Sequence, residues 1–170
     1  MIEINFAKVH PDAIIPSKDK ENAGYDIYAR FDNERILIYP GETIMIPCGI
    51  ASSFSDGYVM ILKERGSTGT KGIGQRSGVI DSGYRNEWLC PITNHNHFKI
   101  LVISKLPEQE YYTKYQDITP EEIIFYPYTK AICQALLLSV PDTEVTELSY
   151  EELQKIPSKR QGGKLGSTGK

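Results

Sequence analysis

The chain has 170 residues, of which 40% are hydrophobic and 24% charged, and its formal net charge is −3. This length and apolar content suit one globular domain, and the weak negative charge excludes binding to long nucleic acid through a general basic field. The three cysteines are far apart and show no CxxC spacing, which argues against a zinc cage or a disulfide framework. The first residues lack the pattern of a signal peptide and no long apolar run follows, so we expect a cytoplasmic protein without a membrane partner.

Short extended segments separated by turn residues occupy most of the chain, which predicts an all-β domain. Residues 35–39 lead through Pro40-Gly41 into an apolar segment at 43–50, and we expect these two segments to form a hairpin. A second break, Ser55-Asp56-Gly57, precedes another expected strand at 58–62.

Two capping patterns occur in the C-terminal half. After Thr119-Pro120-Glu121-Glu122, the β-branched and aromatic residues 123–126 favour a turn that leads into a strand. Ser149 is followed three residues later by Glu152, which predicts a short helix because each side chain can bind the other residue's backbone N–H. From Pro157 to the end, no core-forming periodicity remains.

Glycines, hydroxyl groups and cations gather in two loops, at residues 65–72 and 160–170. Small residues allow close approach of the backbone, and hydroxyl groups and cations bind polyphosphates. The first loop does not fit the GxxxxGK[ST] pattern of a Walker loop, and no obvious helix follows it. Taken alone it is equally consistent with a flexible surface hairpin. The second loop of the same composition favours phosphate binding.

Between the two loops, an apolar strand delivers Asp81 into a glycine-flanked turn that also carries Tyr84. A single aspartate in a turn usually caps the backbone. Near bound phosphates, the same carboxylate can instead orient and deprotonate a water for attack on phosphorus. The residues alone leave both roles open.

Taken in order, these segments resemble the five motifs of the trimeric dUTPase family, at residues 23–29, 65–71, 78–85, 132–134 and 160–169. The ordered set spans nearly the whole chain, which makes the resemblance specific. It implies a jelly-roll-like, all-β subunit in a homotrimer whose active sites each draw on all three chains. It also implies hydrolysis of dUTP to dUMP and pyrophosphate by water attack on the α phosphate. We expect a domain at 1–158 and a flexible C-terminal arm at 159–170.

By this resemblance, Asp81 is the general base, Tyr84 packs beneath the deoxyribose and Asp26 braces the site. The phosphate contacts would come from Arg65, Ser67, Gln134, Arg160, Ser167 and Thr168. Gly66, Leu165 and Gly166 would also belong to the substrate site. Backbone groups of Gly78, Val79 and Ile80 would read the uracil, with Gln75 nearby. Mg²⁺ would be held through the substrate phosphates and water, so no protein ligand is assigned to it.

Four positions depart from the family pattern or add to it. Gly66 stands where many members have serine, and Ala131 stands where the fourth motif usually has arginine. Leu165 replaces the phenylalanine that commonly stacks on uracil. Trp88, the single tryptophan, could supply a stacking ring instead, although a core or trimer contact is favoured. His95 and His97 are expected in a polar turn rather than at a metal.

Two other functions stay open. A dCTP deaminase shares the fold, and Glu87 would then be its catalytic glutamate, although the glycine-rich fifth motif argues against it. Alternatively, the trimer acts as a nucleotide-gated ligand for a regulatory protein. An insertion at about 104–122 carries tyrosines that suit such an interface, as in some phage dUTPases. A hairpin extension that only covers the sheet is the simpler interpretation.

Overall fold

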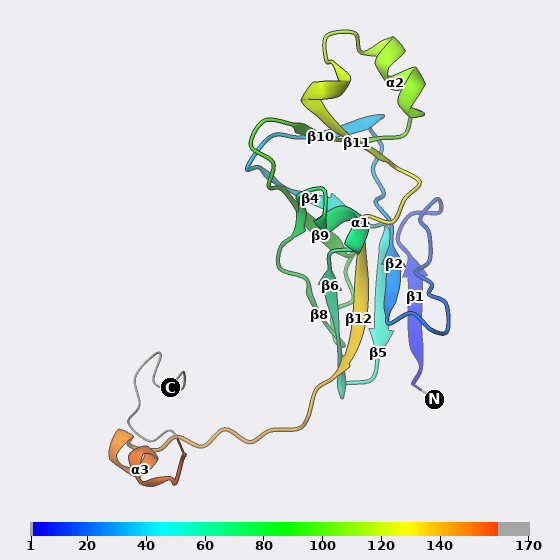
Figure 1. The fold of residues 1–170 in the computed structure, drawn as a ribbon. Coiled ribbons are helices and arrows are strands. Elements are labelled where there is room, and N and C mark those ends of the chain that lie inside the picture. Colours follow the sequence, from blue (N-terminus) through cyan, green and yellow to red (C-terminus); the bar gives the residue numbers. More distant parts are fainter. Residues whose placement is uncertain (1, 160–170) are drawn as a thin grey trace. The chain divides into compact units, whose positions relative to one another are not determined.

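The computed structural model describes residues 2–159. The chain divides into two compact units, and the boundary in the sequence lies between residues 140 and 141. The first unit is built from short strands (Figure 1). They are β1 (Ile4–Lys8), β2 (Gly24–Ile27), β3 (Arg35–Ile38), β4 (Thr43–Pro47), β5 (Ile50–Phe54), β6 (Tyr58–Lys63), β7 (Ile73–Gln75), β8 (Val79–Asp81), β9 (Leu89–Asn94), β10 (Ile100–Ser104), β11 (Ile123–Pro127) and β12 (Cys133–Ser139). The all-β prediction is therefore confirmed.

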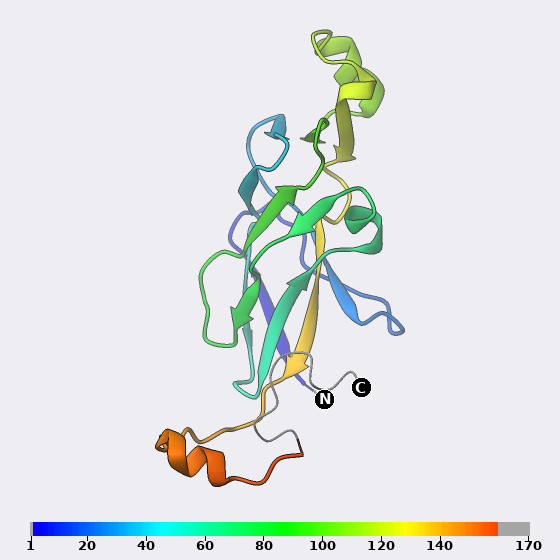
Figure 2. The ribbon, with the colours of Figure 1, turned by 60° about the vertical axis from the view of Figure 1, so that its left-hand side comes forward.

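The strands form four small sheets, in the orders β2-β12-β6-β8, β4-β9-β7, β11-β10-β3 and β1-β5. β6 and β12 pair along most of their length and run side by side through the middle of the unit (Figures 1 and 2). Alternate side chains of the strands point to opposite faces. Those that face inward make one apolar core, which includes Ile27, Ile46, Met60, Trp88 and Leu101.

The hairpin predicted at residues 35–50 is wrong. Its turn exists, since the backbone N–H of Glu42 donates to the carbonyl of Tyr39 at 3.0 Å and Gly41 has a φ of +78°. However, β3 pairs with β10 and β4 pairs with β9, so the two segments enter different sheets. Local sequence indicates where a chain turns, but the long-range partners of each strand decide the pairing.

The insertion connects two parallel strands, β10 and β11, whose register places Ile100 opposite Ile123. A hairpin cannot join parallel neighbours, because the chain has to return to the end at which the first strand began. Here the return path consists of helix α2 (Glu108–Lys114) and a 3₁₀ turn, η1 (Pro120–Glu122), drawn at the top of Figure 1. The strand predicted at 123–126 is confirmed as β11.

The tyrosines of the insertion do not form one exposed surface, although a protein-binding interface was one of the two interpretations of this segment. Tyr111 is fully buried and packs with Val102 and Ile123 in a second apolar cluster. Its hydroxyl accepts a hydrogen bond from Arg35 at 2.8 Å, and the same guanidinium lies 3.5 Å from the ring centre of Tyr115. The insertion therefore covers the β11-β10-β3 sheet with a small core of its own.

The second unit contains helix α3 (Tyr150–Lys155). The backbone N–H of Glu152 donates to the Ser149 hydroxyl at 3.2 Å, and the backbone N–H of Ser149 donates to the Glu152 carboxylate at 2.9 Å. These reciprocal bonds are the predicted capping box, so the helix prediction is confirmed. In the described part of the chain, no helix is long and apolar enough to cross a membrane.

Candidate active site

The first glycine-rich loop begins where β6 ends and forms a single helical turn, α1 (Gly66–Gly69), which the sequence did not predict. Glycine has poor helix propensity, so the turn depends on local side-chain bonds. The buried hydroxyl of Thr68 accepts from the backbone N–H of Arg65 at 3.0 Å and donates to its carbonyl at 2.9 Å. The Thr70 hydroxyl donates to the carbonyl of Gly66 at 2.8 Å. The loop is thus ordered, with Ser67 exposed at its tip.

Arg65 is held against β2 by a two-point ion pair. Its Nε lies 3.1 Å from Oδ1 of Asp26, and a terminal nitrogen lies 3.3 Å from Oδ2. A third bond, at 3.4 Å, runs to the carbonyl of Ala131, which also accepts from the hydroxyl of Tyr126. Burial raises the pKa of Tyr126, so this hydroxyl stays protonated and continues to donate. Arg65 therefore presents a fixed cation whose position depends on Asp26.

Gln134 reaches the same place from β12. Its neighbours Cys133 and Ala135 point into the core, so the alternation of the strand turns Gln134 outward. Its Nε2 donates to the carbonyl of Glu64 at 2.7 Å. A Cβ at position 24 would lie 2.5 Å from the Gln134 side-chain oxygen, so a larger residue at that position of β2 would displace the Gln134 amide.

Together these residues surround a hollow of about 330 Å³, lined by Asn22, Ala23, Gly24, Asp26, Arg65, Gly66, Ser67 and Gln134. The structure thus brings together the predicted residues of the first, second and fourth motifs. A lining with a guanidinium, an amide and a hydroxyl, beside small residues, suits an oxyanion with several oxygens.

Asp81 does not line this hollow. β8 pairs with β6 so that Asp81 lies opposite Val59, whereas Gln134 lies opposite Lys63. Four residues of strand separate those two positions, which is about 13 Å along β6. The Asp81 side chain is exposed. Within one chain, the candidate base and the candidate phosphate site are therefore apart.

Asp81 and Tyr84 share one tight turn. The backbone N–H of Tyr84 donates to the Asp81 carbonyl at 3.0 Å, and the Tyr84 hydroxyl donates to the carbonyl of Glu87 at 3.1 Å. Tyr84 is 37% exposed, so part of the residue is accessible to a ligand. Glu87 has a structural contact, because its carboxylate accepts from the backbone N–H of Gly49 at 2.8 Å.

The connection between β7 and β8 approaches β6 closely. Gly78 has a φ of +100°, and a Cβ there would lie 2.6 Å from the Cβ of Leu62. The backbone N–H of Leu62 donates to the Gly78 carbonyl at 2.8 Å. Gln75 lies beside this contact and uses its amide locally, donating to the carbonyl of Arg76 at 2.8 Å. Val79 is 64% exposed and Ile80 is buried, so only the backbone and one side chain of this segment face outward.

Glu64 is a residue of this region that sequence reasoning missed. Its carboxylate accepts from the backbone N–H of Gln75 at 3.1 Å, and its carbonyl accepts from Gln134. Hydrogen bonds from its own backbone N–H and from that of Gln75, together with the neighbouring Lys63, hold the pKa of Glu64 below its usual value. The only signal in the sequence was its place next to Arg65.

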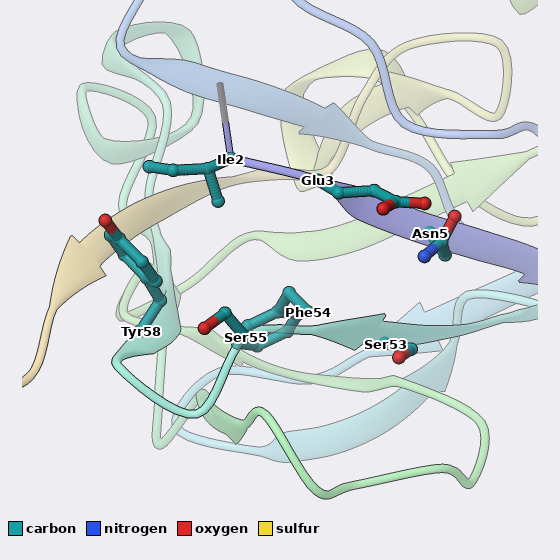
Figure 3. A pocket seen from close by; sticks show the side chains of 7 residues that line it. All are labelled: Ile2, Glu3, Asn5, Ser53, Phe54, Ser55 and Tyr58. Carbon is teal, nitrogen blue, oxygen red and sulfur yellow. The ribbon is translucent and has the colours of Figure 1, made fainter.

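A second hollow, of about 450 Å³, lies between the start of the chain and the turn after β5 (Figure 3). Ile2, Phe54 and Tyr58 give it apolar walls, and Glu3 contributes a carboxylate. No positively charged side chain belongs to the described residues that line it. It is therefore less suited to a polyphosphate than the hollow beside Arg65.

The remaining candidates from the sequence are Trp88, His95 and His97. Trp88 is fully buried, donates to the hydroxyl of Ser52 at 3.1 Å and meets Phe6 edge-on at 5.6 Å, so it is a core residue of the protomer. Among residues 2–159, no group of three or more histidine, cysteine, aspartate or glutamate side chains is placed to hold a metal ion, and His95 and His97 belong to no such group.

The three cysteines lie together in the core although they are far apart in sequence. All are free thiols, and the sulfur atoms of Cys90 and Cys133 are 3.1 Å apart. Hydrogen bonding to Cys133 and Cys48, together with burial, raises the pKa of Cys90 well above its usual value.

The predicted contacts of Arg160, Leu165, Gly166, Ser167 and Thr168 lie outside the described residues.

Comparisons with known proteins give the relatives of the chain. A family model described as dUTPase matches residues 11–105. The chain is 30% identical over 173 residues to the deoxyuridine 5'-triphosphate nucleotidohydrolase of Nautilia profundicola, covering 99% of this chain and 100% of that protein.

Two solved phage structures share the fold. A Staphylococcus bacteriophage 80alpha dUTPase variant with dUpNHpp has a TM-score of 0.71 at 20% identity, and the match covers 97% of both chains. Its description states that phage dUTPases control transfer of virulence genes. A dUTPase variant from phage phi11 of S. aureus has a TM-score of 0.64 at 19% identity, covering 86% of this chain and 96% of that chain. Its description names the coordination of a structural Mg(II) ion.

Proposed function

The chain belongs to the dUTPase family, and from this premise we propose that it hydrolyses dUTP to dUMP and pyrophosphate. The observation that carries the proposal is the hollow in which Arg65, Ser67 and Gln134 converge. Its lining offers a cation, a hydroxyl and an amide to the oxygens of a triphosphate. Arg160, Gly166, Ser167 and Thr168 of the C-terminal arm would add further phosphate contacts.

In the proposed reaction, Asp81 takes a proton from a water that attacks the α phosphorus, and pyrophosphate leaves with the electrons of the broken P–O bond. Arg65 stabilises the charge on the phosphate oxygens. The half-open ring of Tyr84, on the same turn as Asp81, would lie against the deoxyribose, where a 2′-hydroxyl finds no room. Uracil would be read by the backbone of Gly78, Val79 and Ile80, near Gln75.

The separation of Asp81 from the Arg65 hollow supports a homotrimer with shared sites. About 13 Å along β6 is too far for a base to reach a phosphate bound at Arg65. A second chain would supply the Asp81 turn to the first chain's hollow. A third would supply the arm, residues 159–170, to a site formed by the domain, residues 1–158.

Mg²⁺ fits this site only through the substrate. The hollow contains one carboxylate, Asp26, and both of its oxygens face Arg65. This leaves no carboxylate set of the kind that binds Mg²⁺ directly. When bound, the ion would neutralise charge on the phosphate oxygens, while the residues of the chain orient the triphosphate and hold the proton at Asp81.

The alternative of a dCTP deaminase is not favoured by the comparisons, and the carboxylate of Glu87 is bound to the backbone of Gly49.

A regulatory-protein partner rests on a separate observation. Helix α2 turns Gln109, Glu110 and Thr113 outward around a hollow of about 500 Å³, and the phage relatives are described as controlling gene transfer. A Glu110→Lys variant would then retain hydrolysis and lose affinity capture of the partner, whereas unchanged capture would remove α2 from that role.

Pyrophosphate release from dUTP, dTTP, dCTP and UTP at equal concentrations tests the main proposal. We expect release from dUTP, with the other three nucleotides at least about a hundredfold slower in kcat/KM, because the base and sugar contacts are built for one nucleoside. Ammonia release from dCTP would support the deaminase instead. Equal turnover of all four nucleotides would reject both.

A further inference from the structure

We propose that Arg85 is a positioning residue that holds the turn of Asp81 and Tyr84 against β5, and thereby sets the turnover of dUTP and the rejection of UTP. This inference rests on the proposed function, which assigns proton transfer to Asp81 and the sugar contact to Tyr84. Both residues lie on one turn of one chain, so contacts within that chain place them on the body of their subunit. The placement matters whichever chain supplies the phosphate hollow.

The turn is otherwise bound mainly to itself. β8 ends at Asp81, which is also where its pairing with β6 stops, opposite Val59. The backbone N–H of Tyr84 donates to the Asp81 carbonyl, and the Tyr84 hydroxyl donates to the carbonyl of Glu87, so both bonds stay within the segment. A Cβ at Gly83 would meet no atom of residues 2–159 within 4 Å. Packing therefore does not confine the outer side of the turn.

The segment after the turn runs along one edge of β5. The backbone N–H of Trp88 donates to the carbonyl of Ile50 at 2.8 Å. Ser52 lies two residues further along the strand, so its carbonyl projects from the same edge. This carbonyl accepts from Nη1 of Arg85 at 3.3 Å. The guanidinium thus extends, with a side chain, the row of bonds that the backbone begins.

Arg85 carries this edge contact back to the turn. Its Nη1 also donates to the carbonyl of Ser82 and, at 3.4 Å, to that of Tyr84. The next tie along the chain is Glu87, whose carboxylate accepts from the backbone N–H of Gly49 at 2.8 Å. Between β8 and that tie, Arg85 is the described residue that bonds both to the turn and to another strand.

The charge of Arg85 is directed at these carbonyls. None of the ion pairs among residues 2–159 includes Arg85. A hydrogen bond from a charged donor is stronger than one from a neutral donor. All three bonds come from a single nitrogen, whereas Arg65 uses two nitrogens on Asp26. The forked shape of the guanidinium is therefore not needed at position 85, and a lysine can replace it there.

Loosening the turn would affect two properties together. A misplacement of about 1 Å can reduce turnover about a hundredfold, which applies to the base, Asp81. Tyr84 rejects a 2′-hydroxyl through its position, so a loose turn would also admit UTP. A variant that only lowers the folded fraction reduces turnover of dUTP and UTP by the same factor. The ratio of kcat/KM for the two nucleotides therefore separates positioning from stability.

The test compares three variants of the full-length protein. Arg85→Met removes the donors and keeps an apolar stem, and we expect kcat for dUTP and the dUTP to UTP ratio each to fall at least about tenfold. Arg85→Lys keeps one donor nitrogen, and both values should stay within about threefold. Arg30→Ala, the matched control, removes a cation bound to Asp12 and Asp32 and should leave the ratio unchanged.

An unchanged kcat and an unchanged ratio in a folded Arg85→Met protein would overturn the inference. Equal losses in Arg85→Met and Arg85→Lys would also overturn it, because the donor would then not be the cause. Should Arg85→Met not fold, Arg85→Gln takes its place, with a ratio lowered at least about threefold expected and an unchanged ratio rejecting the role.

Hydrogen exchange of the Tyr84 backbone amide, measured without nucleotide, gives a readout independent of activity. Exchange should be faster in Arg85→Met, or in Arg85→Gln, and close to that of the unaltered protein in Arg85→Lys. If the unaltered protein does not hydrolyse dUTP, the proposed function fails. Unchanged Tyr84 exchange in the variant without the arginine rejects the role of Arg85 by itself.

Discussion

Arg65 and Asp26 are in contact in the lining of the hollow, with both carboxylate oxygens within 3.3 Å of the guanidinium. The two residues come from different strands and loops, so their contact joins β2 to the end of β6. Asp26 is 36% exposed and Arg65 is 31% exposed, which leaves the pair accessible to a ligand from one side.

Asp26→Asn should weaken substrate binding without removing the base. The amide accepts at one position only, so the two-point contact to Arg65 is lost and the guanidinium becomes mobile. We expect KM for dUTP to rise by about tenfold and kcat to fall less. Steady-state pyrophosphate release measures both, and a drop in kcat at constant KM would place Asp26 in the chemistry instead.

Asp81→Asn should abolish turnover while nucleotide binding persists, because the amide keeps the shape of the side chain but cannot accept a proton. The expected fall in kcat is at least about a hundredfold. Calorimetry with a non-hydrolysable dUTP analogue would report the affinity. Turnover near that of the unaltered protein would remove Asp81 from the role of base.

Deletion of Lys159 to Lys170 should leave a folded trimer with little activity, since the segment has phosphate-binding chemistry but no apolar periodicity. Sedimentation and pyrophosphate release check the two parts. Mixing deleted subunits with Asp81→Asn subunits should restore activity in some sites if arm and base come from different chains. Full activity of the deleted protein, or absence of folding, contradicts the assignment.

Tyr111 should matter for stability rather than for catalysis. Tyr111→Ala empties the centre of the cluster beneath α2, and we expect a loss of about 3–5 kcal/mol in the free energy of unfolding. Tyr111→Phe removes the bond from Arg35 and should cost about 1 kcal/mol. Tyr150→Phe, at a site that is 74% exposed, serves as the control. Denaturant titration gives the values, and a neutral Tyr111→Ala would mean that α2 does not cover the sheet.

The cysteine thiols should not react in the native protein. All three are buried, and hydrogen bonding to Cys133 raises the pKa of Cys90, which lowers the amount of the reactive thiolate. A thiol-specific disulfide reagent at neutral pH should label no cysteine until denaturant is added, and three afterwards. Rapid labelling of the folded protein would show that the core opens locally.

Much of this architecture could be predicted from the sequence because its signals are local. Turn pairs, the alternation of strands and the Ser149 capping box need only neighbouring residues, and the order of the five motifs gave the family. The failures involve contacts over long distances. The strands at residues 35–50 turn as predicted but pair elsewhere. Tyr111 is buried by a sheet that its own segment does not reveal, and Glu64 accepts hydrogen bonds from Gln75 and Gln134, which lie far from it in the sequence.

The parallel pairing of β10 with β11 places a lower limit on the length of the connection between Ser104 and Ile123. A chain shortened to a tight turn could not reach the start of β11, so removal of residues 106–119 would break a sheet rather than trim a surface. No comparable upper limit applies, because extra residues at the exposed end of α2 add only loop-closure entropy, about 0.6 kcal/mol for each doubling of length. The crossover is therefore a place in this fold where evolution or engineering can add a whole module and leave the sheets unchanged.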